Sequence, residues 1–220
     1  MKISNDTLNI LKNFAVINSN LLFRKGNVQR TASPSRDVWA TVTISENFDR
    51  EFGIYDLNKF LATLSLFDDP DIELQDNHLV ISGGGRKIQY FYTDPEMIKP
   101  VPANVVMPSR DITWTVSTKE LDELRRAASV LQVSDLSLEN IDDKMVMRVC
   151  DRKDDTTNSF YLEVAGDTVD VDFPVIFKSE NLKLIPGTYT ATACRRGICE
   201  FKNTGKNATY YLGMDIKPSK

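Results

Sequence analysis

The stretch EFGIYDLNKFLATLSLF, residues 51–67, decides the fold, because its hydrophobic period changes in the middle. Apolar residues first alternate at Phe52 and Ile54, as they do in a strand with one buried face. After Asp56, a favourable N-cap residue, the period becomes that of one helix face. The apolar residues of that face are Leu57, Phe60, Leu61 and Leu64. The stretch predicts a strand that leads directly into a short helix over residues 57–66.

The same junction returns near the end of the chain. VDVDFPVIFKSENLKLIPG, residues 169–187, again passes from alternating residues into a short helix, expected over 178–185. A longer amphipathic helix precedes each junction, over 4–16 and over 118–131. Strands are expected near 20–24, 27–32, 38–44, 51–55, 72–75, 78–82 and 86–92, and near 134–139, 144–150, 158–164, 171–177, 188–193, 198–202 and 207–214. We infer a two-fold internal repeat of helix, four strands, helix and three strands.

A proline-rich segment separates the two copies. TDPEMIKPVPANVVMPSRD, residues 93–111, contains four prolines and no hydrophobic period, so it is expected to be extended and to expose its apolar residues. The predicted organisation is an N-terminal domain over 1–93, a connector over 94–111 and a C-terminal domain over 112–220. Each domain is expected to be α+β, with a mostly antiparallel sheet and two helices on one side.

Composition limits the functional classes. With 220 residues, 41% hydrophobic and 26% charged, the chain has the make-up of a globular protein. No apolar run approaches the roughly 20 residues of a membrane span, and the N-terminus lacks a signal-peptide pattern, so we expect a cytosolic protein without membrane contact. Three cysteines do not indicate a disulfide framework. Because the net charge is −4, any contact with nucleic acid must come from uneven charge placement.

The predicted helices carry a basic excess in this acidic chain. Their basic residues are Lys12, Lys59, Lys119, Arg125, Arg126, Lys178 and Lys183. Five acidic residues share these helices, so the rest of the chain carries the acidic excess. Two interpretations stay open: ordinary solvated helix faces, or a mildly positive surface that contacts phosphates without reading bases.

No group of side chains predicts catalysis, a cofactor or a metal. The single histidine, His78, lies in a predicted turn. Cys194 and Cys199 flank a hairpin turn, and with Cys150 distant and no histidine nearby a zinc site is not expected. GGGRK lacks the Lys-Ser/Thr ending of a phosphate loop, and the acidic runs DDPDIE and DRKDD lack the spacing of a calcium loop. We expect a non-enzymatic protein.

Two quoted segments and the connector carry a family resemblance. SNDTLNILKNFAVINS (residues 4–19) and IYDLNKFLATLSL (residues 54–66), with the proline-bearing joint, resemble the DNA polymerase sliding clamps of T-even-type bacteriophages. The resemblance covers the whole chain; YDLN followed by FL is its most specific part, and the second half matches mainly by pattern. It implies the DNA clamp fold, in which three two-domain subunits join head to tail into a closed ring, with helices lining the hole.

The resemblance also implies the partners. They are double-stranded DNA bound without sequence specificity, the replicative DNA polymerase, an ATP-driven clamp loader, and the sigma-like and co-activator proteins of viral late transcription. The implied location is the cytoplasm of the infected bacterial host. The alternative from another class is a phage structural or carbohydrate-binding β-rich protein.

The run RKIQYFYTD, residues 86–94, looks like an edge strand that needs a partner. The resemblance implies that it pairs with the strand around NSFYLEV, residues 158–164, of the next subunit. The residues expected to meet are Tyr90, Phe91, Tyr92, Phe160, Tyr161 and Leu162. In the alternative interpretation these aromatic residues are half buried in their own domain.

The apolar residues of the connector predict a contact surface. The resemblance implies that partner peptides dock beside the connector, in one shared groove whose methionines suit changing partners. The residues expected to line it are Pro34, Val38, Met97, Ile98, Val101, Val105, Val106, Met107, Tyr211, Met214 and Ile216. In the alternative interpretation the connector only covers the gap between two sheets.

Overall fold

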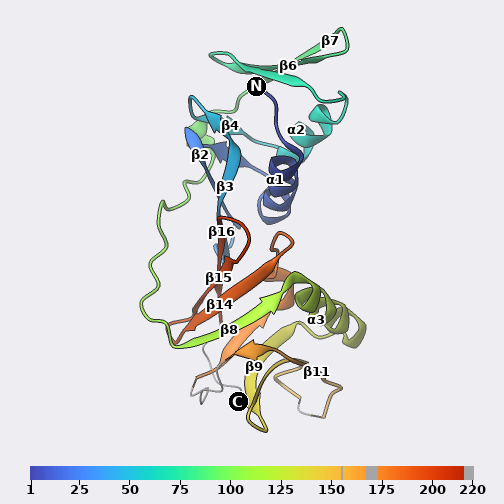
Figure 1. Cartoon of the computed structure of the whole chain (residues 1–220), viewed down its shortest axis with the longest axis vertical. Coiled ribbons are helices and arrows are strands. Elements are labelled where there is room, and N and C mark those ends of the chain that lie inside the picture. Colours follow the sequence, from blue (N-terminus) through green and yellow to red (C-terminus); the bar gives the residue numbers. More distant parts are fainter. Residues whose placement is uncertain (155, 167–172, 216–220) are drawn as a thin grey trace. The chain divides into compact units, whose positions relative to one another are not determined.

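The computed structural model describes residues 1–154, 156–166 and 173–215, which form two compact units (Figure 1). The first unit contains Met1–Pro34 and Trp39–Ala103, and the second contains Ser35–Val38 and Asn104–Lys220. The finer division into 1–93, 94–111 and 112–220 stays a prediction. Among the described residues no helix is both long enough and apolar enough to cross a membrane.

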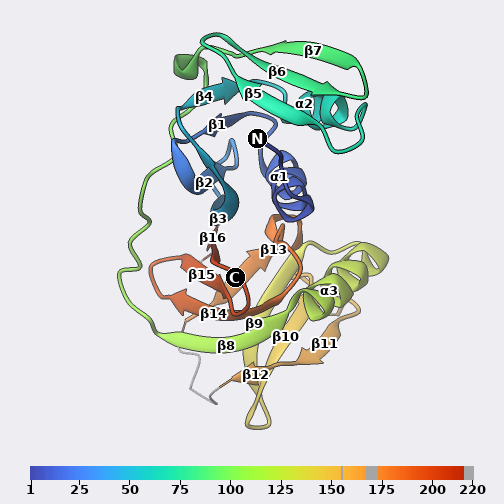
Figure 2. The ribbon, with the colours of Figure 1, turned by 45° about the horizontal axis from the view of Figure 1, so that its top comes forward.

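Two helices lie side by side in the first unit (Figure 2). α1 (Asn5–Ile17) begins after Ser4, whose side chain accepts a hydrogen bond from the backbone N–H of Thr7. α2 (Leu57–Leu64) begins after Asp56, whose carboxylate accepts one from Lys59 N at 2.9 Å. Both helices lie where the sequence predicts them, because N-caps and helical periodicity are local signals.

The strands of the first unit are all antiparallel. β1 (Leu21–Phe23) pairs with β4 (Phe52–Ile54), and β2 (Gly26–Ala32) pairs with β3 (Val38–Phe48). β5 (Asp71–Leu74), β6 (His78–Gly83) and β7 (Arg86–Phe91) form a meander with β7 at one edge. Phe23, Phe48, Phe52 and Phe60 fill the core, with ring centroids 4.7 to 6.1 Å apart.

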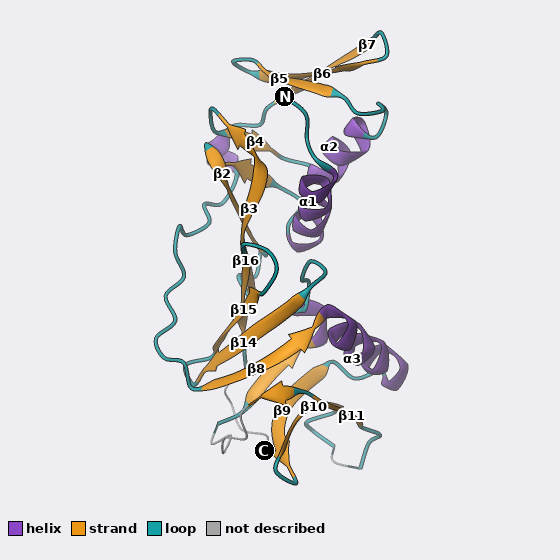
Figure 3. Ribbon diagram, viewed as in Figure 1, coloured by secondary structure: helices purple, strands orange, loops and turns teal. Residues whose placement is uncertain are grey.

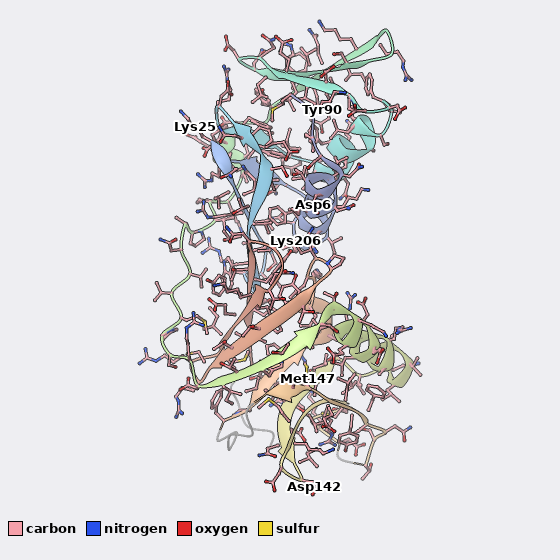
Figure 4. All side chains as sticks on the ribbon, viewed as in Figure 1. Asp6, Lys25, Tyr90, Asp142, Met147 and Lys206 are labelled. Atoms are coloured by element: carbon pink, nitrogen blue, oxygen red, sulfur yellow. The ribbon has the colours of Figure 1, made fainter. Side chains whose placement is uncertain are left out.

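The second unit contains α3 (Thr118–Leu131) and two antiparallel sheets, drawn as orange strands in Figure 3. One sheet has the order β12-β8-β14-β15-β16 and the other β11-β10-β9-β13. The strands are β8 (Ile112–Ser117), β9 (Asp135–Ile141), β10 (Lys144–Cys150), β11 (Phe160–Glu163), β12 (Ala165–Gly166), β13 (Val175–Lys178), β14 (Thr188–Cys194), β15 (Ile198–Asn203) and β16 (Ala208–Gly213). Trp114, Phe177 and Phe201 meet in its core, where Met147 is also fully buried (Figure 4).

The helix predicted over 178–185 is wrong. The structure has a single 3-10 turn there, η2 (Ser179–Asn181), so the second unit has one α-helix in its described part and not two. The segment is too short for its helical hydrogen bonds to offset the free-energy cost of nucleating a helix. Pro186 also disfavours helical backbone at the residue before it. Leu182 and Ile185 are instead buried from an irregular chain. A second 3-10 turn, η1 (Pro95–Met97), begins the connector.

The sequence prediction also missed β8. Ile112, Trp114 and Val116 alternate and are buried, which is the pattern of a half-buried strand. β8 lies directly between the proline-rich connector and α3, and its last residue, Ser117, is also the N-cap of α3. The sequence prediction assigned the connector and the helix and left no strand between them. In the first unit, Met1 exchanges two backbone hydrogen bonds of 2.7 Å with Ile72 of β5.

Candidate nucleic-acid interface and protein-docking surfaces

The exposed faces of the three α-helices are mainly basic. The exposed basic residues are Lys12 on α1, Lys59 on α2, and Lys119, Arg125 and Arg126 on α3. The exposed acidic residues on these helices are Asp6, labelled in Figure 4, and Asp122. In a chain of net charge −4, these helix faces therefore carry the opposite sign from the whole.

Helix capping accounts for part of this asymmetry on α3. The Glu120 carboxylate accepts hydrogen bonds from the backbone N–H and the hydroxyl of Ser117, at 2.6 and 2.7 Å, so it serves the helix N-terminus. Asp122 binds the guanidinium of Arg125. A shallow hollow of about 910 Å³ on this face is lined by Thr118, Lys119, Asp122, Arg125, Arg126, Ser129, Leu184 and Pro186. Three bases and one acid line it, which suits an anionic polymer.

A buried carboxylate holds the N-terminus of α1. Glu46 of β3 accepts a hydrogen bond from Ser4 N at 2.6 Å and another from the Thr7 hydroxyl, and it is 9% exposed. Burial raises the pKa of Glu46, but the hydrogen bonds from Thr7 and Ser4 outweigh burial and hold the pKa below its ordinary value. This negative charge is therefore kept beneath α1 and away from its exposed face.

Two of the predicted phosphate-binding residues are not on a helix. Lys178 is the last residue of β13, and its ammonium binds the Asp135 carboxylate. Lys183 follows the η2 turn and is half buried. Placing these two lysines on a helix was wrong, for the same reason that the 178–185 helix is absent. The other five predicted bases do lie on α-helices.

The two strands expected at a subunit interface are both edge strands. β7 is the end strand of the β5-β6-β7 sheet, and β11 is the end strand of the β11-β10-β9-β13 sheet. On β7 the side chain of Phe91 is 61% exposed, and on β11 that of Tyr161 is 52% exposed. Phe160 and Leu162 are half buried. Each edge offers unpaired backbone groups within the described part of the chain.

Tyr90 and Tyr92 contact their own unit. Tyr90, labelled in Figure 4, donates a hydrogen bond to the carbonyl of Asp56 at 3.3 Å and lies against Phe60. The Tyr92 hydroxyl donates to the carbonyl of Gln75 at 3.1 Å. The period of a strand explains the split, since it directs Phe91 outward and its two neighbours inward.

Sequence reasoning missed an apolar hollow between α3 and β11. Its volume is about 510 Å³, and its lining residues are Glu123, Arg126, Ala127, Val130, Leu131, Ser159 and Phe160. Val130 is 79% exposed. The signal was present in the sequence, because Ala127 and Val130 widen the apolar face of α3, next to Leu131, into the polar side of the helix.

The structure divides the predicted docking residues between the two units. Pro34, Met97, Ile98 and Val101 belong to the first, and Val38, Val105, Val106, Met107, Tyr211 and Met214 to the second, while Ile216 lies outside the described residues. Val106 and Met97 are 79% and 65% exposed. Ile98 and Val38 are buried, at 4% and 1% exposed, so the expectation that they line a surface groove is wrong. Ile98 is buried because it packs closely over Gly53.

Polar contacts fasten the end of the connector to the second unit. Arg110 donates to the Glu200 carboxylate at 2.8 Å, and Ser109 donates to Asp111 at 2.5 Å. The Ser109 hydroxyl, with Arg195, holds the pKa of Asp111 below its ordinary value. Burial, with the nearby charge of Glu200, raises the pKa of Tyr211. Exposed Val106 therefore precedes an anchored segment.

Cys194, Cys199 and His78, which were considered as possible metal ligands, do not come together in the structure. Cys194 pairs with Ile198, and Ala193 with Cys199, so the two thiols point to opposite faces of the sheet. His78 begins β6, and its ring nitrogen lies 2.7 Å from the Asn77 side-chain oxygen. Among the described residues no three His, Cys, Asp or Glu side chains are grouped to hold a metal ion.

Comparison with known proteins finds similarity to phage replication proteins. The family described as DNA polymerase processivity factor matches residues 4–98. The sliding clamp of Vibrio phage KVP40 is 27% identical over 221 residues, covering 98% of this chain and 99% of that protein. The sliding clamp of Enterobacteria phage T4 is 28% identical over 228 residues, covering 98% and 97%. Over almost its whole length, the chain is similar to these phage sliding clamps. Because a processivity factor acts without catalysing a reaction, this match confirms the prediction of a non-enzymatic protein.

Solved structures confirm the clamp fold. Proliferating Cellular Nuclear Antigen from Entamoeba histolytica superposes with a TM-score of 0.70 at 11% identity, covering 94% of each chain. The PCNA of A. fulgidus, solved with the C-terminal region of FEN-1 bound, gives 0.65 at 15% identity, covering 96% of this clamp chain and 95% of that one. At such low identity these likenesses establish the α+β DNA clamp architecture alone.

Proposed function

We propose that three copies of this clamp chain close into a ring around duplex DNA and tether the replicative polymerase for processive synthesis. One observation carries the proposal: the exposed faces of α1, α2 and α3 are basic on an acidic chain whose residues 4–98 match the DNA polymerase processivity factor family. Scattered lysines and arginines make screened phosphate contacts that do not read bases, so they hold DNA loosely enough for sliding. A clamp loader places the ring on DNA in the cytoplasm of the infected bacterium.

The test of the DNA-facing helices is a triple charge reversal. Replacing Lys12, Lys59 and Lys119 by Glu is expected to shorten the products of polymerase extension at moderate salt and to reduce clamp loading on nicked circular DNA. The molar mass of the assembly is expected to be unchanged, because none of these residues lies on β7 or β11.

The matched control carries the same change in net charge elsewhere. Lys25, Lys153 and Lys202 are exposed and lie outside the helices, and their replacement by Glu is expected to leave extension close to wild type. If the helix variant stimulates polymerase as well as this control does, the three helices do not face DNA.

We propose that partner proteins dock on the second unit beside the exposed end of the connector. Val105, Val106 and Met107 would form one side of the docking surface, and Tyr211 and Met214 the other. Support comes from the 79% exposure of Val106 and from the A. fulgidus PCNA solved with a C-terminal region of FEN-1 bound. The polymerase, the clamp loader and the sigma-like and co-activator proteins of late transcription would use this surface in turn.

The docking surface is tested with a fluorescent peptide from the C-terminus of the polymerase. Val106→Glu combined with Met214→Glu is expected to weaken peptide binding at least about ten-fold, since a charge enters an apolar contact. Val16→Glu, at a valine 62% exposed on α1, is the control and should bind normally. Equal binding by the double variant would place the docking surface elsewhere.

A further inference from the structure

A small hollow in the first unit lies at the root of the connector. Its lining residues are Asn18, Asn20, Leu21, Leu22, Arg24, Arg30, Thr31, Ile98, Lys99 and Val101. They come from the end of α1, from β1 and β2, and from the first residues of the connector. The hollow is narrow, with room for about one water molecule. Three basic side chains line it and no acidic one does, although the chain has a net charge of −4.

The three basic side chains are not equally available. Arg24 binds the Glu51 carboxylate at 2.8 Å, so its charge is neutralised within the unit. Arg30 and Lys99 form no ion pair with any described residue. The hollow therefore keeps two positive charges without a counter-charge.

Arg30 also has an unsatisfied donor. Its Nε atom is buried and has no hydrogen-bond partner among the described residues. A buried donor of a charged group that lacks a partner is costly, so such atoms are rare without a water or ligand beside them. One water would satisfy Nε but would leave the charges of Arg30 and Lys99 uncompensated. An anionic oxygen would accept the hydrogen bond from Arg30 Nε and would also compensate the charges of Arg30 and Lys99.

We propose that this hollow is a carboxylate site that receives an aspartate or glutamate side chain of a partner peptide running along the start of the connector. One oxygen of a carboxylate can take the space of the single water beside Arg30 Nε, while its second oxygen stays at the opening of the hollow. Leu22 and Val101, which also line the hollow and are half buried, offer apolar contact to the flanking part of a peptide. Duplex DNA presents rows of phosphates, whereas this site offers a single opening and two charges. The site is separate from the docking residues of the second unit.

The test uses the full chain labelled with ¹⁵N-arginine, and the Arg30 Nε–Hε resonance, assigned by its loss in Arg30→Gln, is the readout. The probes are acetyl-Leu-Glu-amide, its glutamine counterpart, acetate and inorganic phosphate, each at constant ionic strength. The glutamate peptide is expected to shift the resonance in a saturable way, and the glutamine peptide is expected to leave it in place. The test needs neither DNA nor polymerase, so its failure would leave the tethering proposal intact.

Two variants sharpen the result. Lys99→Gln, at an exposed residue where folding is not at risk, is expected to weaken glutamate-peptide binding by about two- to five-fold, the size of one exposed ion pair. Lys25→Gln, at an exposed lysine outside the hollow, should bind like wild type. An unmoved resonance would mean that a water satisfies Arg30. Tighter binding of phosphate, or equal binding of acetate, would overturn the assignment to a peptide carboxylate.

Discussion

Glu46 shows how one residue connects the core to the helix surface. Its carboxylate is buried, yet hydrogen bonds from Ser4 and Thr7 make the charged form the favoured one. Because its folded-state pKa lies below the unfolded value, the charged group stabilises the fold above the unfolded pKa. That stabilisation is lost as the pH falls through the folded-state pKa.

We therefore expect Glu46→Gln to lower the free energy of unfolding by about 1 to 3 kcal/mol at pH 7, the cost of disturbing hydrogen bonds to a buried charge. The difference from wild type should shrink below pH 4.5, the ordinary pKa of the group, as the wild-type carboxyl becomes protonated. Urea unfolding at fixed protein concentration measures both. Glu51→Gln, which removes a half-exposed pair with Arg24, should cost less than about 1 kcal/mol. Equal losses for the two variants would contradict the role given to Glu46.

At the scale of elements, local signals were sufficient for the three α-helices. Each has an N-cap side chain, Ser4, Asp56 or Ser117, followed by one apolar face. The sequence did not predict the local structure where tertiary contacts determine it. The run 178–185 contains apolar residues at helical spacing, but its short length and Pro186 leave a 3-10 turn that burial of Leu182 and Ile185 holds in place.

The contact between β4 and the start of the connector, from Thr93 to Ile98, is a second tertiary contact that hydrophobic periodicity does not reveal. Thr93 N donates to the carbonyl of Gly53 at 2.9 Å, and Ile98 covers the same glycine. A Cβ at Gly53 would lie 2.8 Å from the Thr93 carbonyl oxygen and 3.0 Å from Ile98 Cδ1. This close approach explains why Ile98 is buried although the segment around it reads as an exposed linker.

Gly53→Ala is accordingly expected to lower the free energy of unfolding by about 1 to 3 kcal/mol, because the added methyl group overpacks a site with backbone on one side. Amide hydrogen exchange at Thr93 should become faster as the start of the connector separates from β4. Gly205→Ala is the matched control, since the nearest atom to its added Cβ lies 3.8 Å away. It should change stability by less than about 1 kcal/mol. Unaltered hydrogen exchange at Thr93 would show that the start of the connector accommodates the added methyl group without separating from β4.

At the scale of the whole molecule, the sequence predicted charge placement better than contact surfaces. Lys12, Lys59 and the bases of α3 were found because exposed helix positions follow from periodicity alone. The pairing of Lys178 with Asp135 and the apolar hollow beside β11 depend on which strands are neighbours. Strand neighbours are set by long-range contacts that a single sequence does not display.

The proposed ring makes a prediction about direction as well as number. In a head-to-tail trimer, β7 of each subunit meets β11 of the next, and every subunit uses both edges once. Phe91→Asp combined with Phe160→Asp should therefore give folded monomers of 24.9 kDa by light scattering, because a charge enters both sides of each contact. Val16→Asp on α1 is the control and should remain a trimer.

The two single variants distinguish a head-to-tail contact from a two-fold one. A Phe91→Asp chain keeps an intact β11, and a Phe160→Asp chain keeps an intact β7. In an equimolar mixture, β11 of the first chain can therefore still pair with β7 of the second. In a head-to-tail ring that contact joins one chain of each kind and cannot continue, so the mixture should form heterodimers that neither variant forms alone. A two-fold contact between identical edges would instead let one of the single variants dimerise with itself. Self-dimers from either variant, or intact trimers in the mixture, would therefore rule out the pairing of β7 with β11.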